Sequence, residues 1–205
     1  TAPDSDAKDV EQAIEHVSAH HHEWSALAPE ARADILIRAA DVLASKADEL
    51  AEELVREEGK TLAEARMEAR RTPQNLRYYA GEALRLTGET FPSGDGSWVF
   101  TSRGPVGVVA AITPWNFPLN IPSRKLGPAL AAGNGVVFKP SELTPRSGQR
   151  LVEALVEAGV PGGALALVHG HADVGRALVS DSRVGAVTFT GSTTVGEAIH
   201  RAVPA

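Results

Sequence analysis

The stretch VGVVAAITPWN (residues 106–116) joins a short apolar run to a rigid corner that carries a tryptophan and an asparagine. Short apolar runs recur downstream at GVVFK, ALALVHG and VGAVTFTG, and stretches with helical periodicity separate them. Buried strands that alternate with helices of about three turns predict parallel strands, right-handed crossovers and helices on both faces. The sequence therefore predicts an α/β fold with a doubly wound, mostly parallel sheet.

Polar or glycine-containing corners follow each of these predicted strands. They are TPWN (113–116), KPSE (139–142), HGHADVG (169–175) and FTGS (189–192). Ligands of open parallel sheets bind beyond the carboxyl ends of the strands. We therefore expect any binding site at these corners.

Upstream of the predicted sheet the pattern changes to amphipathic helices. Apolar residues recur at helical spacing from Pro29 to about Gly59, which predicts one long helix. A second helix is expected to begin at a Thr61–Glu64 capping box, to bend or break at Pro73, and to stop near Gly88.

A hairpin is predicted between these helices and the sheet. Turn residues at 92–96 precede the β-prone run 98–101, so residues 89–104 read as two strands and a turn. The expected organisation is an N-terminal helical part (1–88), this hairpin, and a sheet-containing part (105–205).

Composition limits the possible functions. The 205 residues are 43% hydrophobic, enough for one core and an appendage. Twenty basic against 26 acidic residues give a net charge of −6, which argues against a nucleic acid partner. No apolar run reaches the roughly 18 to 20 residues that span a bilayer, so we expect a cytoplasmic protein without a membrane segment. The chain has no cysteine, and therefore no disulfide or thiol nucleophile of its own.

Other polar residues are expected to carry no chemistry. His20–His22 are adjacent, so on a helix they point in different directions and form a solvated face rather than a metal site. Glu57 and Glu58 are likewise expected at a helix surface. Ser192 lacks the G-x-S-x-G context of a nucleophile. No metal site is predicted.

A phosphate could bind where the last predicted strand meets a helix. Gly191, Ser192 and Gly196 open that helix, where free backbone N–H groups and the helix dipole favour an anion. A tight strand-to-helix turn without a ligand explains these residues equally well, because the motif is not G-x-G-x-x-G.

Lys139 and Glu142 could hold the hydroxyls of a ribose. Lys139 ends an apolar strand, and Glu142 follows the rigid corner at Pro140. A carboxylate there would accept hydrogen bonds from ribose hydroxyls and repel a 2′-phosphate, so NAD would be preferred to NADP. The alternative is that Ser141 caps a helix beside a simple Lys–Glu ion pair.

Asn116 could donate a hydrogen bond to a developing negative charge. It lies between Pro114 and Pro118, so its backbone has few conformations to lose on ordering. The alternative is an asparagine that only caps the following turn.

Together these motifs carry a resemblance to a known family. GPVGVVAAITPWNFPLNIPSRKLGPALAAGNGVVFKPSELTP, followed by AGVPGGALALVHG and VTFTGSTTVG, closely resembles the aldehyde dehydrogenase superfamily in order, spacing and identity. The NAD-linked semialdehyde dehydrogenases look nearest. The resemblance also includes REEGKTLAEAR and the hairpin, so it covers essentially the whole chain.

The resemblance implies a Rossmann-like NAD-binding part at 105–205 and roles for particular residues. Asn116 matches the family's oxyanion-hole asparagine. The implied cofactor-binding residues are Ile112, Thr113, Pro114 and Trp115 at the nicotinamide, Lys139, Ser141 and Glu142 at the adenosine ribose, Gly175 near the adenine, and Gly191, Ser192 and Gly196 at the pyrophosphate. The hairpin corresponds to the family's arm that pairs subunits, which implies a homo-oligomer.

The implied reaction oxidises a small aldehyde or semialdehyde to its acid. In the family a cysteine thiolate attacks the aldehyde, the asparagine amide holds the oxyanion and NAD takes a hydride. The nucleophilic cysteine lies downstream of FTGST in the family, and this chain has none. The resemblance therefore favours the N-terminal part of a longer dehydrogenase, incomplete without a C-terminal catalytic region and inactive alone. The alternative is a catalytically silent nucleotide-binding or assembly module.

Overall fold

The computed structural model, which describes residues 3–203, contains a four-stranded parallel sheet. Its strands are β3 (Val108–Ile112), β4 (Gly135–Lys139), β5 (Leu165–Leu167) and β6 (Val184–Phe189), in the order β5-β4-β3-β6. Every neighbouring pair in the sheet is parallel. The predicted α/β fold with a parallel sheet is confirmed.

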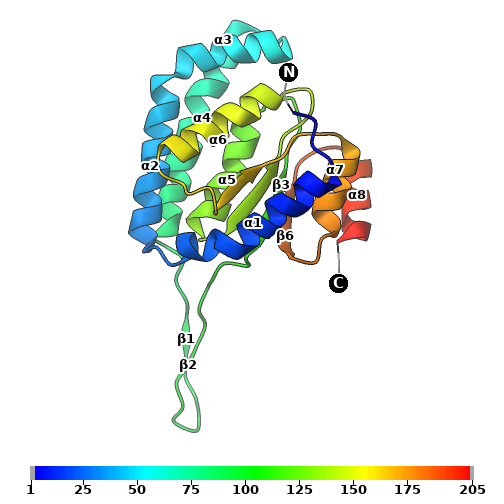
Figure 1. Cartoon of the computed structure of the whole chain (residues 1–205). Coiled ribbons are helices and arrows are strands. Elements are labelled where there is room, and N and C mark those ends of the chain that lie inside the picture. The colour runs from blue at the N-terminus through cyan, green and yellow to red at the C-terminus, as the bar shows by residue number, and fades with distance from the viewer. Residues whose placement is uncertain (1–2, 204–205) are drawn as a thin grey trace.

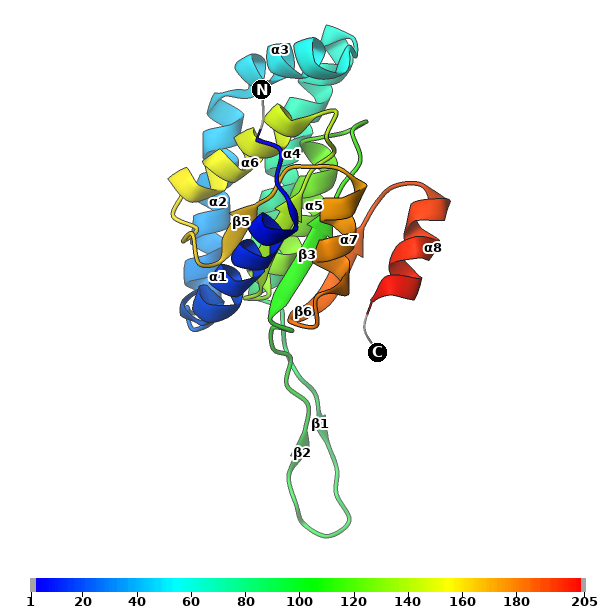
Figure 2. The same ribbon diagram turned by 45° about the vertical axis from the view of Figure 1, so that its right-hand side comes forward.

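Helices cover both faces of the sheet, because successive side chains of the central strands point to opposite sides. Val108 and Ala110 pack with α1 (Ala7–Ser25) and α7 (Ala172–Ser180). Val109 and Ala111 pack instead with α2 (Pro29–Ser45), α5 (Asn120–Ala131) and α6 (Pro145–Glu157). Figures 1 and 2 show α1 and α7 on one side of the strands, with α8 beside α7, and the helices α2, α4 and α5 on the other side. Two hydrophobic cores therefore enclose the sheet.

The helix α1 was not predicted from the periodicity, although its start carries a clear signal. Asp6 and Asp9 form a capping box in which Asp6 accepts from the Lys8 and Asp9 amides at 2.8 and 3.0 Å. Its inner face includes Trp24, which is fully buried and donates from Nε1 to the Leu130 carbonyl at 2.9 Å. This contact fixes α1 to α5.

The single helix expected from Pro29 to Gly59 is wrong: α2 ends at Ser45, and α3 (Ala47–Glu58) begins after Lys46. A straight helix of that length would extend about 45 Å, more than a domain of this size needs to cover. The break lets Leu50 and Leu54 turn into the same core as the residues of α2. Burying apolar residues of both segments therefore stabilises the fold more than the hydrogen bonds of one continuous helix would.

The helix α4 (Leu62–Ala83) begins at the predicted Thr61–Glu64 capping box, which is present. It passes through Pro73, which is buried, without interruption, contrary to one reading of the sequence. It also ends five residues before Gly88. A Cβ at Gly88 would lie 1.7 Å from the Thr101 carbonyl oxygen, so this glycine permits close approach of the hairpin strands rather than ending the helix.

The predicted hairpin is present in outline. The strands β1 (Thr90–Phe91) and β2 (Val99–Phe100) pair antiparallel, and the segment extends well away from the body of the molecule (Figure 1). Its apolar side chains face water, and Trp98 is 88% exposed.

The two glutamates expected at a helix surface have other environments. Glu57 accepts from the backbone N–H groups of Arg146 and Ser147 at 2.6 and 2.9 Å, so it caps the start of α6. The side chain of Glu58 is only 7% exposed, and Lys60 Nζ lies 3.0 Å from its Oε2. The partners of Glu57 are 89 and 90 residues away in the sequence, and Glu58 is buried by tertiary packing beside Lys60, so helical periodicity revealed neither environment.

The last helix, α8 (Thr193–Ala202), is loosely held within the part of the chain that the structure describes. None of its residues is buried, and it stands to one side of β6 in Figure 2. The strand β6 pairs with β3 only and forms one edge of the sheet. No helix among residues 3–203 combines the length and apolarity needed to cross a membrane.

Candidate functional site

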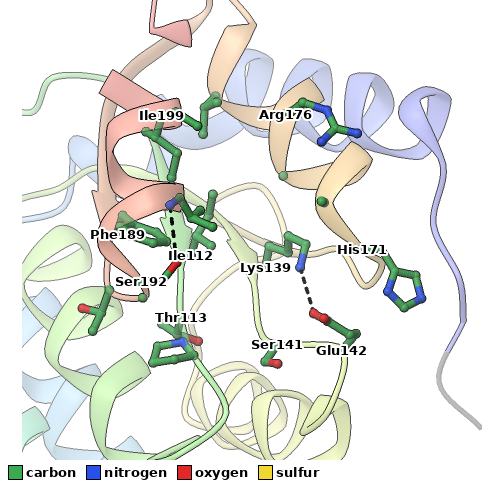
Figure 3. Close-up of a pocket in the computed structure, with 18 of the residues that line it drawn as sticks. Ile112, Thr113, Lys139, Ser141, Glu142, His171, Arg176, Phe189, Ser192 and Ile199 are labelled. Atoms are coloured by element: carbon green, nitrogen blue, oxygen red, sulfur yellow. Dashed lines mark hydrogen bonds and ion pairs between the residues drawn. The ribbon is translucent and has the colours of Figure 1, made fainter. Parts of the chain in front are cut away.

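The strand order reverses at β3, and the corners meet there. The chain runs from β3 to β4 to β5 in one direction and then places β6 on the opposite side of β3. A cavity of about 360 Å³ opens at the carboxyl ends of these strands, between α7 and α8 (Figure 3). Its volume lies within the range of small-molecule sites. This is the position at which open α/β sheets bind ligands.

Most of the predicted cofactor residues line this one cavity. They are Ile112, Thr113 and Pro114 after β3, Lys139, Ser141 and Glu142 after β4, Gly175 on α7, and Gly191 and Ser192 after β6. Gly196 lines an adjacent hollow with Gly191 and Ser192. Trp115 and Asn116 are exposed on the corner after β3 and are not part of the cavity lining. The structure thus brings together nine of the eleven predicted cofactor residues.

Lys139 and Glu142 lie next to each other in the cavity wall, and their side chains point toward each other (Figure 3). Lys139 Nζ lies 3.9 Å from Glu142 Oε2 and donates to the Pro140 carbonyl at 3.2 Å. The lysine side chain is 7% exposed and the glutamate 43%, so the carboxylate remains available to a ligand. Burial lowers the pKa of Lys139, and the Glu142 and Asp173 carboxylates oppose this shift.

Ser141 does not cap a helix, contrary to the alternative considered from the sequence. The N-cap of α6 is Thr144, and Ser141 Oγ accepts instead from the Leu143 amide at 3.2 Å. The Ser141 hydroxyl therefore stabilises the turn that presents Glu142.

The start of α8 forms another part of the cavity wall. Ser192 is its N-cap and accepts from the Val195 amide at 3.4 Å. A Cβ at Gly191 would lie 2.4 Å from Phe189 Cζ, and one at Gly196 would lie 3.4 Å from the same ring. Close packing on Phe189 thus accounts for Gly191 without a ligand, whereas the separation at Gly196 is an ordinary contact, and the open helix N-terminus still faces the cavity.

A buried hydroxyl at the cavity lacks a partner. Thr113 Oγ1 is inaccessible to water and has no hydrogen-bond partner among the described residues. Buried polar atoms of this kind are rare, since each costs about 1–3 kcal/mol. A ligand in the cavity could reach this hydroxyl only if the side chain moved.

Ten further residues line the cavity and were not singled out from the sequence as cofactor residues, and His171, Arg176 and Phe189 are among them. His171 and Arg176 lie five positions apart around the first turns of α7, and Phe189 is the last residue of β6. His171 and Phe189 lie in strand-end corners at which a site was expected, whereas the place of Arg176 depends on α7 packing beside β6, which no local pattern encodes.

The histidine segment shows no metal-binding arrangement. His20 and His22 are exposed, as predicted, whereas His21 is half-buried and hydrogen-bonds through Nδ1 to the Val17 carbonyl at 3.1 Å. Within residues 3–203 there is no group of three or more histidine, cysteine or acidic side chains positioned to hold a metal ion.

The fold and the cavity define a class of protein: a doubly wound α/β domain with a ligand site at its strand-order reversal. The family model described as the aldehyde dehydrogenase family matches residues 1–205. The chain belongs to the aldehyde dehydrogenase family.

Known proteins resemble this chain in both sequence and structure. The alpha-ketoglutaric semialdehyde dehydrogenase of Bacillus subtilis is 43% identical over 200 residues, which are 97% of this chain and 41% of that protein. The crystal structure of an E. coli NADP dependent enzyme matches 98% of this chain and 42% of its own chain, with a TM-score of 0.95 and 38% identity. The structure of PnpE in complex with nicotinamide adenine dinucleotide matches 97% and 41%, with a TM-score of 0.94 and 39% identity. The chain thus spans about two fifths of the relatives it matches.

Proposed function

We propose that this chain supplies the cofactor site and the oxyanion-hole asparagine of an NAD-dependent aldehyde dehydrogenase that oxidises a small aldehyde or semialdehyde to its acid. The observation that carries the proposal is the cavity at the strand-order reversal, where Lys139, Glu142 and the N-terminus of α8 face one space. Membership in the family supports the reaction class.

The residues around the cavity suit a dinucleotide. Glu142 can accept hydrogen bonds from ribose hydroxyls beside the Lys139 ammonium, and the start of α8 offers backbone N–H groups to a phosphate. A bound nicotinamide dinucleotide would supply a hydride acceptor, and these residues would hold and orient it.

Glu142 is the reason to favour NAD over NADP. Its exposed carboxylate would repel a 2′-phosphate. Relatives of similar structure include one solved with nicotinamide adenine dinucleotide and one described as NADP dependent, so the family uses both cofactors. Glu142→Gln should shift the ratio of kcat/KM values toward NADP by about tenfold, equivalent to ~1.4 kcal/mol. Glu157→Gln, which removes an exposed carboxylate paired with Lys46 at the other end of α6, is the matched control.

Asn116 is proposed as the oxyanion donor. Its side chain is exposed on the corner after β3, free of the core, where it could meet a carbonyl oxygen. The 205 residues contain no cysteine, so a thiol nucleophile would have to come from outside them. This chain would then fix the oxyanion and the cofactor, while other residues attack the aldehyde.

The test uses the full-length gene product with an aldehyde and NAD. The wild type should form NADH only when the aldehyde is present, and Asn116→Ala should lower kcat by about two to three powers of ten. The KM for NAD should stay nearly constant in this variant, because Asn116 lies outside the cavity lining. An unchanged kcat would remove Asn116 from the mechanism.

The exposed arm formed by β1 and β2 supports a homo-oligomer as the working form. Trp98, Val99 and Phe100 present apolar surface to water on a segment that contacts little else in the described structure. Such surface is typical of a protein interface.

A further inference from the structure

Glu68 of α4 holds the end of the corner that carries Asn116. Its side chain is fully buried, and its Oε1 accepts from the backbone N–H groups of Leu119 and Asn120 at 2.9 and 3.0 Å. These groups belong to the first turn of α5, which would otherwise leave them unpaired. A carboxylate at this position also interacts favourably with the helix dipole.

Lys60 holds the middle of the same corner. Its ammonium donates to the Asn116 carbonyl at 3.2 Å and to Glu68 Oε2 in a short hydrogen bond. It also lies 4.5 Å from the centroid of the Phe117 ring, and its ion pair with Glu58 completes the cluster. The backbone of Asn116 is therefore tied directly to a buried charge.

Stability alone does not explain this arrangement. The side chains of Glu58, Lys60 and Glu68 are 7%, 8% and 0% exposed, so all three have lost most of their hydration. Buried ion pairs rarely stabilise a fold more than apolar residues of similar volume, because their desolvation offsets their attraction. The cluster does provide directional, charge-assisted hydrogen bonds to three backbone groups within five residues, 116 to 120.

Gly59 makes the cluster possible. It ends α3 in the left-handed conformation, with φ of 84°, and so turns the chain between Glu58 and Lys60. The chain then enters α4, whose second turn carries Glu68. The end of α3, the linker and the second turn of α4 thus bring Glu58, Lys60 and Glu68 together beside one corner.

We propose that Lys60 and Glu68 are positioning residues that hold the 113–120 corner so that the Asn116 amide is aimed at the reacting carbonyl. The inference rests on the function proposed above. Pro114 and Pro118 restrict the corner internally, and the two charged side chains fix it to the helical layer. A displacement of about 1 Å at a catalytic group can lower a rate about a hundredfold, so such anchoring matters for turnover.

The first measurement is kcat of Glu68→Gln in the full-length protein at saturating NAD. A glutamine keeps the size of the side chain, but its amide cannot pair with Lys60 and accept both backbone N–H groups equally well. We expect kcat to fall by about tenfold, which is less than the loss expected when Asn116→Ala removes the side-chain amide itself. The Leu119 and Asn120 amides should also exchange hydrogen faster.

A double-mutant cycle separates positioning from general destabilisation. If Glu68 acts through Asn116, then Glu68→Gln should change kcat by less than about twofold in the Asn116→Ala background. Lys60→Met should behave in the same way and provides a second variant should Glu68→Gln fold poorly. Equal losses of kcat in both backgrounds would overturn the proposal, as would an unchanged kcat in Glu68→Gln.

Glu57→Gln is the matched control. Glu57 caps α6 as Glu68 caps α5, through two backbone N–H groups, but it does not contact the Asn116 corner. This variant should speed exchange at Arg146 and Ser147 while kcat stays within about twofold of the wild type. If the wild type forms no NADH with any aldehyde, the proposed function fails. Amide exchange at Leu119 and Asn120 then still decides whether Glu68 anchors the corner.

Discussion

At the scale of the residue, Glu58 shows how burial changes the chemistry of one side chain. Burial raises the pKa of its carboxyl group, the Lys60 ammonium opposes the shift, and the nearby Glu68 carboxylate adds to it. A carboxyl whose pKa is higher in the folded than in the unfolded state contributes its stability fully below the unfolded pKa, about 4.3. That contribution is lost as the pH rises through the folded pKa.

Glu58→Gln should therefore gain stability relative to the wild type as the pH rises. The glutamine has the same shape as the protonated glutamate but cannot ionise, so the two proteins should have similar urea midpoints near pH 4. At pH 7 the variant should have the higher midpoint. Glu52→Gln, at an exposed pair with Arg56, is the control and should change little at either pH. A variant that is less stable by the same amount at both pH values would contradict this account.

At the scale of the element, helix ends show which features a sequence can reveal. The Thr61–Glu64 capping box and the glycine at the end of α3 are local signals, and the structure has helix boundaries at both. The break at Lys46 carries no side-chain cap, and the caps that Glu57 and Glu68 provide involve partners 51 to 90 residues away. No local pattern contains such partners, so the sequence predicted the helices but not what stabilises several of their ends.

Gly59→Ala should destabilise the protein by about 1 kcal/mol. The added Cβ meets no atom within 4 Å, so the cost is that of holding alanine at a φ of 84°. Gly81→Ala is the matched control, because Gly81 lies inside α4 with equally open surroundings. It should stabilise the protein by about 0.5–1 kcal/mol through higher helix propensity. Urea denaturation of both variants measures the difference, and shifts of the same sign would refute it.

At the scale of the whole molecule, the strand-end corners explain why so much of the candidate site was predictable. In a parallel sheet every carboxyl end lies at the same edge, so corners that are separate in sequence must meet. Lys139, Glu142 and Ser192 could be grouped on that basis, and the structure places them around one cavity. Arg176 and Lys60 could not be assigned to their sites from the sequence, because their positions depend on how whole helices pack.

The exposed arm leads to a prediction about assembly. Replacing Trp98 and Phe100 by serine should weaken oligomers of the full-length protein, because much of the apolar surface of the arm would no longer be available to a neighbouring copy. Sedimentation velocity over a range of concentrations should show a smaller species for the variant than for the wild type. The arm has few contacts with the body, so the thermal midpoint of the dissociated species should be unaffected. An unchanged mass would exclude the arm from the interface.

The positions of the three tryptophans have a practical consequence. Trp24 is fully buried, Trp115 is half exposed on its corner, and Trp98 is almost fully exposed on the arm. The fluorescence of the chain is therefore a sum of three emitters with graded access to a quencher. Iodide should quench the fluorescence of Trp98 first and that of Trp115 next, and should quench Trp24 only when the polypeptide is denatured.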